Sequence, residues 1–502
     1  MLRALLLALV FLQSIFLSAQ GLTGTIVDGQ GESIPFATVA YGKEKGVITN
    51  ENGEFLIAVV PEDLIEITIS AMGFETKTVA RASISTAPIT LTKKSINLNE
   101  VYVSNKNLTA EEIVERVMLR VDSNYVNAYR KKQFFIRETT SNAVRQFDIE
   151  VDKSTIKELN QALINKFLAN VPKQSNSYTE SLGDYYGKGA KASIDLHKVA
   201  NLYNPAASSN LDELTTYLEQ IIKEHVKSDS YYKIRSGIIG VKVDADDMGI
   251  EKDTVAPKPK TTEEIKQDSL DRLKRHHDAA RYALLKANGK QFWREDLDFD
   301  VFQKPRKYEF IRNGYSIIDG EVAYRIEFVP KRSADFEGVM YVNTVDYGIY
   351  RLEYSNVRPL SKLRLFGISH KEDVSKGIYI YSKTDGKYQM SYCEIEIGET
   401  TGVNRPLTII EKNKNVRGRR KQNELDMDVE VVISNIDKLQ LVFMSDENFS
   451  EEEYEKLSLD ENVTIKSFTK YDPEYWSDYT IIQPNDALKQ FDISGRSGNS
   501  SE

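Results

Sequence analysis

Alternating aspartates are the first side chains in this sequence whose type and spacing could do chemistry. Asp296, Asp298 and Asp300 could offer carboxylate oxygens to a calcium ion. An EF-hand loop beginning at Asp296 would need glycine at its sixth position and glutamate at its twelfth, but Val301 and Lys307 stand there. We therefore predict no calcium site and interpret the three aspartates as the acidic face of one strand.

A second acidic series, further along the chain, receives the same interpretation. Glu424, Asp426, Asp428 and Glu430 alternate, and such charges would also protect an edge strand from pairing with another chain. The run Arg417–Lys421, just before them, contains four basic residues in five positions. We predict that it forms a solvated turn, with lipid phosphates or lipopolysaccharide as the alternative contact.

Histidine spacing gives no indication of a zinc site. No HExxH motif occurs, and adjacent histidines on a helix point about 100° apart, so they cannot chelate one ion together. His370 is followed by Glu372 and Asp373, which an exposed loop explains equally well. The chain has five histidines: His197, His225, His276, His277 and His370.

The sequence contains one partial match to a nucleotide-binding motif. The segment 187–192 (GKGAKA) matches a G-x-G-x-x-A pattern, but no apolar strand precedes it, so a loop is predicted. Neither a P-loop nor a G-x-S-x-G motif is present. We predict no catalytic, cofactor-binding or metal-ligating residue, no cofactor, and no enzyme activity.

The single cysteine and the richest aromatic cluster are both interpreted as packing residues. Cys393 lies in an alternating run, where a buried thiol is expected rather than a nucleophile. The segment 471–482 contains Trp476 among several tyrosines, and packing is expected, with a sugar-binding platform as the alternative.

The N-terminus predicts export. Residues 1–19 carry Arg3, an apolar stretch and small residues at Ser18 and Ala19, the order of a secretory signal peptide. No cysteine follows the signal, since Gln20 and Gly21 stand there, so a lipoprotein is not predicted. No later apolar run approaches about 18 residues, which argues against a transmembrane helix. The net charge of −9 argues against a general nucleic-acid binder.

Residues 20–103 show short alternating runs separated by turn residues, a pattern typical of an antiparallel β-sandwich. Asp28-Gly29 and Asn52-Gly53 supply tight turns, because these pairs tolerate positive φ angles. The strands on either side of them alternate apolar and polar residues, as in Ile65, Ile67 and Ile69.

Several motifs in this domain carry a resemblance to a known family. Segments 24–28 (GTIVD), 34–39 (IPFATV), 46–55 (GVITNENGEF) and 69–74 (ISAMGF) resemble the carboxypeptidase regulatory-like domain, and 98–103 (LNEVYV) resembles its closing segment in Bacteroidota envelope proteins. The resemblance implies a transthyretin-like β-sandwich that acts as a non-catalytic accessory module. In that phylum such a module often precedes outer-membrane receptors.

Residues 104–290 are predicted to be a helical region. Thr109 and Glu112 form a capping box before one amphipathic helix, and Thr261 and Glu264 form another before a charged helix that ends at Asn288-Gly289. Apolar spacing predicts two more helices, through 156–167 and through 214–222, whereas 133–138 reads as a strand.

The polar stretch 242–262 is predicted to be an exposed linker. Asp253-Thr254-Val255 in it, and Asp268-Ser269-Leu270 after it, resemble the O-glycosylation sequon of exported Bacteroidota proteins.

Residues 291–490 change to a period of two and are predicted to form an antiparallel β-rich domain, followed by a disordered polar tail over 491–502. Segments 314–326 and 338–343 resemble strands of exported Bacteroidota proteins that carry the same N-terminal domain, and the strand rhythm resembles the half-barrels of periplasmic lipoprotein carriers. The fold class is therefore mainly β with α: a transthyretin-like β-sandwich, then an α+β region with a curved antiparallel sheet, for which a half-barrel is one form.

These observations predict a non-enzymatic, exported cell-envelope protein, located in the periplasm or associated with the outer membrane. It is expected to bind an apolar or envelope-derived ligand, with an outer-membrane protein, a lipid or a glycan as candidate partners. Two alternatives stay open: a hydrolase that acts on envelope polymers, and a purely structural scaffold.

Overall fold

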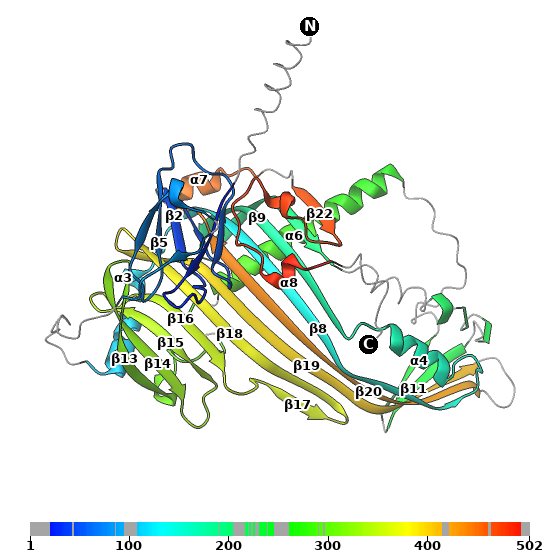
Figure 1. The fold of residues 1–502 in the computed structure, drawn as a ribbon. Coiled ribbons are helices and arrows are strands. Elements are labelled where there is room, and N and C mark those ends of the chain that lie inside the picture. The colour runs from blue at the N-terminus through cyan, green and yellow to red at the C-terminus, as the bar shows by residue number, and fades with distance from the viewer. Residues whose placement is uncertain are drawn as a thin grey trace, which may run out of the picture.

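The computed structural model describes residues 21–492 apart from 43–44, 86, 95–107, 190, 204–215, 219, 222–223, 226–229, 238, 245–260, 290, 295–296, 414–420 and 460–462 (Figure 1). The predicted signal peptide, the first O-glycosylation sequon and the polar tail from residue 493 lie outside these residues. Within the described chain, no helix is both long and apolar enough to cross a membrane.

The N-terminal domain is the predicted β-sandwich. One sheet has the strand order β4 (Glu54–Ile57), β1 (Leu22–Val27) and β7 (Ile89–Thr90), and the other has the order β3 (Lys45–Ile48), β2 (Thr38–Gly42), β5 (Glu66–Ser70) and β6 (Lys77–Ala80). Gly53 turns the chain with a φ of 73°, and a Cβ there would lie 2.4 Å from the Ile26 carbonyl oxygen. The turn therefore requires glycine, as the Asn-Gly pair predicted.

The rest of the chain builds one curved, 15-stranded sheet. Its strand order is β13 (Tyr308–Ile318), β14 (Glu321–Pro330), β15 (Phe336–Asn343), β16 (Ile349–Asn356), β18 (Ile368–Thr384), β19 (Lys387–Asn413), β20 (Lys421–Phe443), β8 (Arg130–Ser154), β9 (Gln174–Lys188), β10 (Lys191–Leu202) and β22 (Thr464–Phe468). Four further strands pair at its margins: β11 (Ser230–Ser236) with β19, β12 (Ile239–Asp244) with β11, β17 (Lys362–Leu365) with β18, and β21 (Glu447–Asn448) with β8. The sheet is mixed, because β10 and β22 are parallel.

The prediction that residues 104–290 are helical is wrong for much of that range. Strands β8 to β12 lie within it, and β12 includes the first residues of the predicted linker. The sheet also crosses the predicted boundary at residue 290, since β8 pairs with β20 over most of its length. Strand β8 contains two extra, bulged residues, Arg145 and Asp152. These bulges interrupt the period of two that would have identified a long strand.

Two of the predicted helices begin at their capping boxes. In α2 (Ala110–Leu119) the Glu112 N–H donates to Thr109 Oγ1 at 3.2 Å, and the Glu264 N–H does the same with Thr261 before α6 (Thr262–Gly289). The helix predicted over 156–167 begins later, as α4 (Gln161–Asn170), because Asn160 is its N-cap. The helix expected through 214–222 lies partly outside the described residues. Shorter helices are α3 (Val121–Asn124), α7 (Glu451–Glu455) and α8 (Asp486–Lys489).

One end of the long strands is covered on both faces. On the face that we call the helix face, α6 packs against β10 and β20, and α2 packs against β13. Both helices and the segment 292–302 share one core with β8, β19 and β20, which includes Phe134, Leu441 and Ala287. On the opposite face, called the sandwich face, Phe135 and Tyr392 pack beneath the N-terminal β-sandwich and the C-terminal segment 471–491. The three-layer arrangement buries this half of the sheet.

A buried ion pair attaches the C-terminal segment to the sandwich face. Arg137 and Glu180 are cross-strand neighbours on β8 and β9, with 2.7 Å between the Arg137 guanidinium and Glu180 Oε1. Arg137 also donates to the Ile482 carbonyl oxygen at 2.8 Å, and the Trp476 indole N–H donates to Glu180 Oε2 at 2.7 Å. Trp476 is therefore a packing residue, as predicted.

The same C-terminal segment holds the N-terminal β-sandwich. The Asn50 amide donates to the Pro484 carbonyl oxygen at 3.1 Å, and Lys489 pairs with Glu54 at 2.6 Å. The Phe36 ring lies 5.1 Å from that of Tyr392 on β19. The β-sandwich thus rests on the large sheet through specific contacts.

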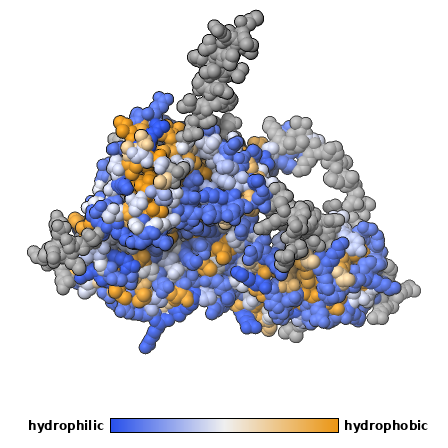
Figure 2. Space-filling view, in the orientation of Figure 1, coloured by the Kyte–Doolittle hydropathy of each residue, from blue (hydrophilic) through white to orange (hydrophobic). Residues whose placement is uncertain are grey.

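Over the other half of the long strands, the described residues form no continuous second and third layers. From about residue 138 onward in β8, side chains are half-buried or exposed, and the same holds for β20 before residue 439. Helix α4 covers the far end of the helix face, where Phe167 contacts Phe147. Figure 2, viewed as Figure 1, shows hydrophobic and hydrophilic residues intermixed over the long strands, with a larger hydrophobic area on the β-sandwich.

Candidate functional site

The first acidic series does not form the strand face that was predicted. Asp298 and Asp300 lie in a bent segment and not in a strand, while Asp296 is outside the described residues. Asp300 is buried, accepts a hydrogen bond from the Tyr308 hydroxyl at 2.6 Å and pairs with Lys304 at 3.1 Å. It therefore anchors a turn against β13, which explains the carboxylate without a metal.

The second acidic series lies on a central strand, so the prediction of a protected edge is wrong. Strand β20, which contains it, pairs with β19 on one side and with β8 on the other. Ion pairs with Lys153 and Lys421 lower the pKa of Glu424, through hydrogen bonds from Lys153 first and from Lys421 second. These charges decorate the polar sandwich face, and of the basic run 417–421 only Lys421 is described.

Four of the five histidines each contact a different polar neighbour. His197 faces Asp184 at 3.7 Å, His225 faces Glu158 at 3.1 Å, and His276 contacts Asn201 at 3.4 Å. His370 contacts Thr401 at 3.1 Å. Across the described part of the chain, no three His, Cys, Asp or Glu side chains gather as metal ligands would.

Two other motifs are placed as their patterns predicted. The glycine-rich segment after Tyr186 forms the turn between β9 and β10, not the start of a helix. Cys393 is fully buried in the core of the helix face.

The half-covered sheet exposes a continuous apolar patch on its helix face. Cross-strand pairing aligns Leu365 with Ile368, Ile368 with Val403, and Val403 with Val431. Because paired residues share a face, these side chains and the alternate residues Leu363 and Ile433 lie on one surface. The apolar patch consists of Leu363, Leu365, Ile368, Val403 and Ile433, which are 36–54% exposed.

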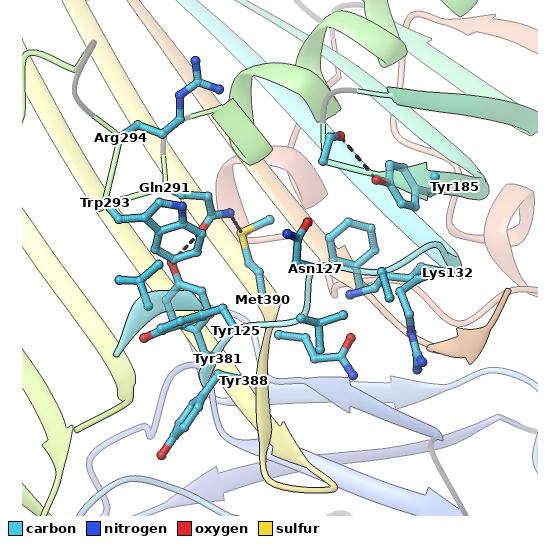
Figure 3. Close-up of a pocket in the computed structure, with 18 of the residues that line it drawn as sticks. Tyr125, Asn127, Lys132, Tyr185, Gln291, Trp293, Arg294, Tyr381, Tyr388 and Met390 are labelled. Atoms are coloured by element: carbon cyan, nitrogen blue, oxygen red, sulfur yellow. Dashed lines mark hydrogen bonds between the residues drawn. The ribbon is translucent and has the colours of Figure 1, made fainter. Parts of the chain in front are cut away.

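A cleft opens at the covered end of the same strands (Figure 3). It comprises two adjoining cavities of about 470 Å³ and 740 Å³, which share the segment between α3 and β8 and the start of β19. The first extends to residues 291–294 and the second to strands β2 and β3 of the N-terminal β-sandwich. Volumes of a few hundred Å³ are typical of small-molecule sites.

Aromatic side chains form one wall of the cleft, on the left of Figure 3. Tyr125 is its centre: its ring lies 4.7 Å from that of Trp293, 5.4 Å from Tyr381 and 5.6 Å from Tyr388. The Tyr125 hydroxyl accepts the Ile349 N–H at 2.9 Å, and the Tyr381 hydroxyl donates to Gln291 Oε1 at 2.6 Å. These bonds fix the rings, and Trp293 stays half-exposed at the edge.

Basic side chains form the opposite wall. Arg130 Nε lies 2.6 Å from Asp446 Oδ1, and Lys132 Nζ lies 3.4 Å from Asp446 Oδ2, so one carboxylate serves two cations. Lys132 also lies over the Phe443 ring at 4.8 Å. Burial lowers the pKa of Lys132, and the charge of Asp446 opposes that shift only in part.

Gln389, which lines both cavities, has a buried acceptor. It is 9% exposed and pairs with Ser382 across β18 and β19. Its Oε1 has no hydrogen-bond partner among the described residues. A buried amide oxygen without a partner costs about 1–3 kcal/mol, so a ligand that donates to it would be stabilised.

Sequence reasoning missed both surfaces. The cleft draws Tyr125, Lys132, Trp293 and Gln389 from segments far apart in the chain, and no motif connects them. The apolar patch had a weak signal in the run 363–368 (LRLFGI), where apolar residues surround a turn. The signal was insufficient because an exposed and a buried apolar strand face have the same pattern.

Comparison with known proteins identifies one region of the chain. Residues 22–103 match the family model of the CarboxypepD_reg-like domain, which confirms the resemblance of the N-terminal β-sandwich and leaves the large sheet outside the match. Among curated proteins, none matches the chain.

Two solved structures align with much of the chain at low similarity. A domain from Vibrio parahaemolyticus, described as an outer membrane lipoprotein-sorting protein, has 6% identity and a TM-score of 0.17 over 69% of this chain and 98% of its own. A chain of the Pseudomonas aeruginosa MucA/MucB complex has 7% identity and a TM-score of 0.15 over 64% and 93%. Alignments at these TM-scores do not establish a common fold.

Proposed function

We propose that this protein is an exported, non-enzymatic binding protein of a Bacteroidota-like cell envelope, and that the apolar patch of its large sheet holds an apolar ligand such as an acyl chain. The N-terminal β-sandwich then acts as an accessory module, as its family resemblance implies. The order of residues 1–19 supports export to the periplasm, where the protein would work free or at the outer membrane.

The exposure of the apolar patch carries this proposal. Five large aliphatic side chains lie side by side on four strands, and soluble proteins rarely leave such a group in water without a partner. Each Å² of apolar surface removed from water contributes roughly 25 cal/mol, so even partial coverage by an acyl chain is favourable. The opposite face of the same strands carries Glu430, Asp428 and Asp426, which suits it to solvent.

A titration with a fluorescent fatty acid, cis-parinaric acid, tests the proposal. The variant that combines Val403→Ser with Ile433→Ser should bind the probe at least tenfold more weakly, because two apolar contacts become polar. Val432→Ser is the matched control: Val432 neighbours Ile433 but pairs with Gly402 on the sandwich face. It should bind like the unchanged protein.

The alternatives give different results. Equal binding by all three proteins, or no binding, would contradict an apolar site on this face and favour a structural scaffold. Turnover of peptide, ester or glycan substrates by the purified protein would contradict the non-enzymatic assignment and favour a hydrolase.

A further inference from the structure

The cleft differs from the apolar patch in its chemistry, and its charge opposes that of the whole chain. The chain has a formal net charge of −9, whereas the cleft has more basic than acidic lining residues. The basic residues are Lys45, Arg130, Lys132, Arg294 and Lys387, and the acidic ones are Asp122, Asp385 and Asp446.

In the cleft, the two cations Arg130 and Lys132 share a single acidic partner, Asp446. This one carboxylate contacts both Arg130 and Lys132, and both cations are largely withdrawn from water. Burial removes water from a charged group, and this loss is costly unless an opposite charge compensates for it. An anionic ligand would therefore be stabilised beside these two cations. A carboxylate or a phosphate group has the oxygen geometry that Arg and Lys bind.

The other two features of the cleft specify the rest of the ligand. Gln389 Oε1 needs a donor, which a bare carboxylate or a fully ionised phosphate does not supply but a hydroxyl group does. Trp293 and Tyr125 present aromatic rings, whose negative faces attract the polarised C–H groups of a sugar ring. A molecule with all three properties is a sugar that bears an acidic group.

We propose that the cleft binds an acidic sugar, with its carboxylate or phosphate at Arg130 and Lys132, a hydroxyl donating to Gln389, and its ring against Trp293. This site is separate from the apolar patch, so either proposal can fail without the other.

Isothermal titration with four probes tests the ligand class: glucuronate, glucose 6-phosphate, glucose and inorganic phosphate. Glucuronate or glucose 6-phosphate should bind at least tenfold more tightly than both glucose and phosphate. The comparison of the two acidic sugars shows which acidic group the cleft prefers. Phosphate binding as tightly as glucose 6-phosphate would reveal a plain anion site and overturn the proposal, as would glucose equal to the acidic sugars, or no binding of any probe.

Tryptophan fluorescence locates the bound sugar. The chain has two tryptophans, and Trp476 is 2% exposed and bonded to Glu180, so a sugar-dependent change should come from Trp293. Trp293→Phe should remove the change. If it persists in this variant, the sugar does not bind in the cleft.

Two variants separate the contacts. Gln389→Leu should weaken acidic-sugar binding about tenfold, and Lys132→Met should remove the preference for acidic over neutral sugars. Lys376→Met, which removes an exposed lysine from the sandwich face, is the control and should bind normally. Normal binding by both cleft variants contradicts the site, and if Lys132→Met does not fold, the Gln389→Leu result decides alone. The cis-parinaric acid titration should be unchanged in all of them.

Discussion

The two halves of the long strands show how layers, rather than strands, decide the role of a residue. Leu441 and Ile433 lie on the same strand, β20, and on the same face, yet the first is fully buried and the second is 43% exposed. Helix α6 packs on the helix face of the first half, and the β-sandwich and C-terminal segment cover its sandwich face. Among the described residues, α4 and the residues around Ile221 pack at the far end of the second half, and the apolar patch between the two ends is exposed. The covered half supplies stability, and the uncovered half supplies an apolar surface.

The largest expected effect comes from breaking the buried ion pair of the covered half. Glu180→Gln removes the negative charge that pairs with the buried Arg137 guanidinium. The free energy of unfolding should therefore fall by about 3–5 kcal/mol. Denaturant titration measures this loss. Glu396→Gln removes the acid of an exposed pair with Lys376 and should cost no more than about 1 kcal/mol. Equal losses would mean that the C-terminal segment is not held as described.

A core truncation on β20 should come next. Leu441→Ala removes a fully buried side chain that packs against the helix face, and a cost of about 2–5 kcal/mol is typical of such a change. Thermal or denaturant unfolding detects it. A cost below about 1 kcal/mol would show that α6 does not cover this half.

A smaller loss is expected where the β-sandwich meets the C-terminal segment. The Asn50 side chain accepts from the Asn52 and Glu54 N–H groups at 2.9 Å each and donates to Pro484. Asn50→Ala removes these three bonds and a fourth, which the Asn50 amide donates to Glu54 Oε2 at 2.8 Å. At about 1 kcal/mol or less per bond, the substitution should cost roughly 1–4 kcal/mol. Unfolding of the full chain followed by tryptophan fluorescence measures this. Asn52→Ala, which loses one exposed bond to Asp486, should change little.

The smallest effect on stability is expected in the uncovered half. Ile433→Ala removes a side chain that already contacts water, so the free energy of unfolding should change by less than about 1 kcal/mol. A large loss in denaturant titration would show that a further layer covers this residue in solution. Together with Leu441→Ala, this variant compares the loss of unfolding free energy in the two halves of the same strand.

The sequence predicted the β-sandwich, the capped helices and the second-half strands because local chemistry fixes them. Asn52-Gly53 defines a turn, and Thr109 with Glu112 defines a helix start, whatever the rest of the chain does. The sequence pattern did not predict that β8 to β12 belong to the large sheet. Strand β8 alternates apolar residues such as Phe147, Ile149 and Val151 with charged ones, but the bulges at Arg145 and Asp152 interrupt the period.

The candidate sites were even harder to predict from the sequence than the strands were. Tertiary neighbours account for the two acidic series: Asp300 bonds to Tyr308 in a bent segment, and β8 pairs with the strand that carries the series around Asp428, so that strand is not an edge. The cleft arises only when α3, β8, β19 and the β-sandwich come together. No local pattern encodes such a meeting of distant segments.

Photocrosslinking of a bound acyl chain tests the central claim most directly. The unchanged protein would be irradiated with a diazirine fatty acid and digested, and the labelled residues would be identified by mass spectrometry. We expect labels on the helix face of the uncovered half, at or beside Leu365, Val403 and Ile433. Labels confined to the sandwich face, to the covered half or to the cleft would contradict it, as would the absence of any label.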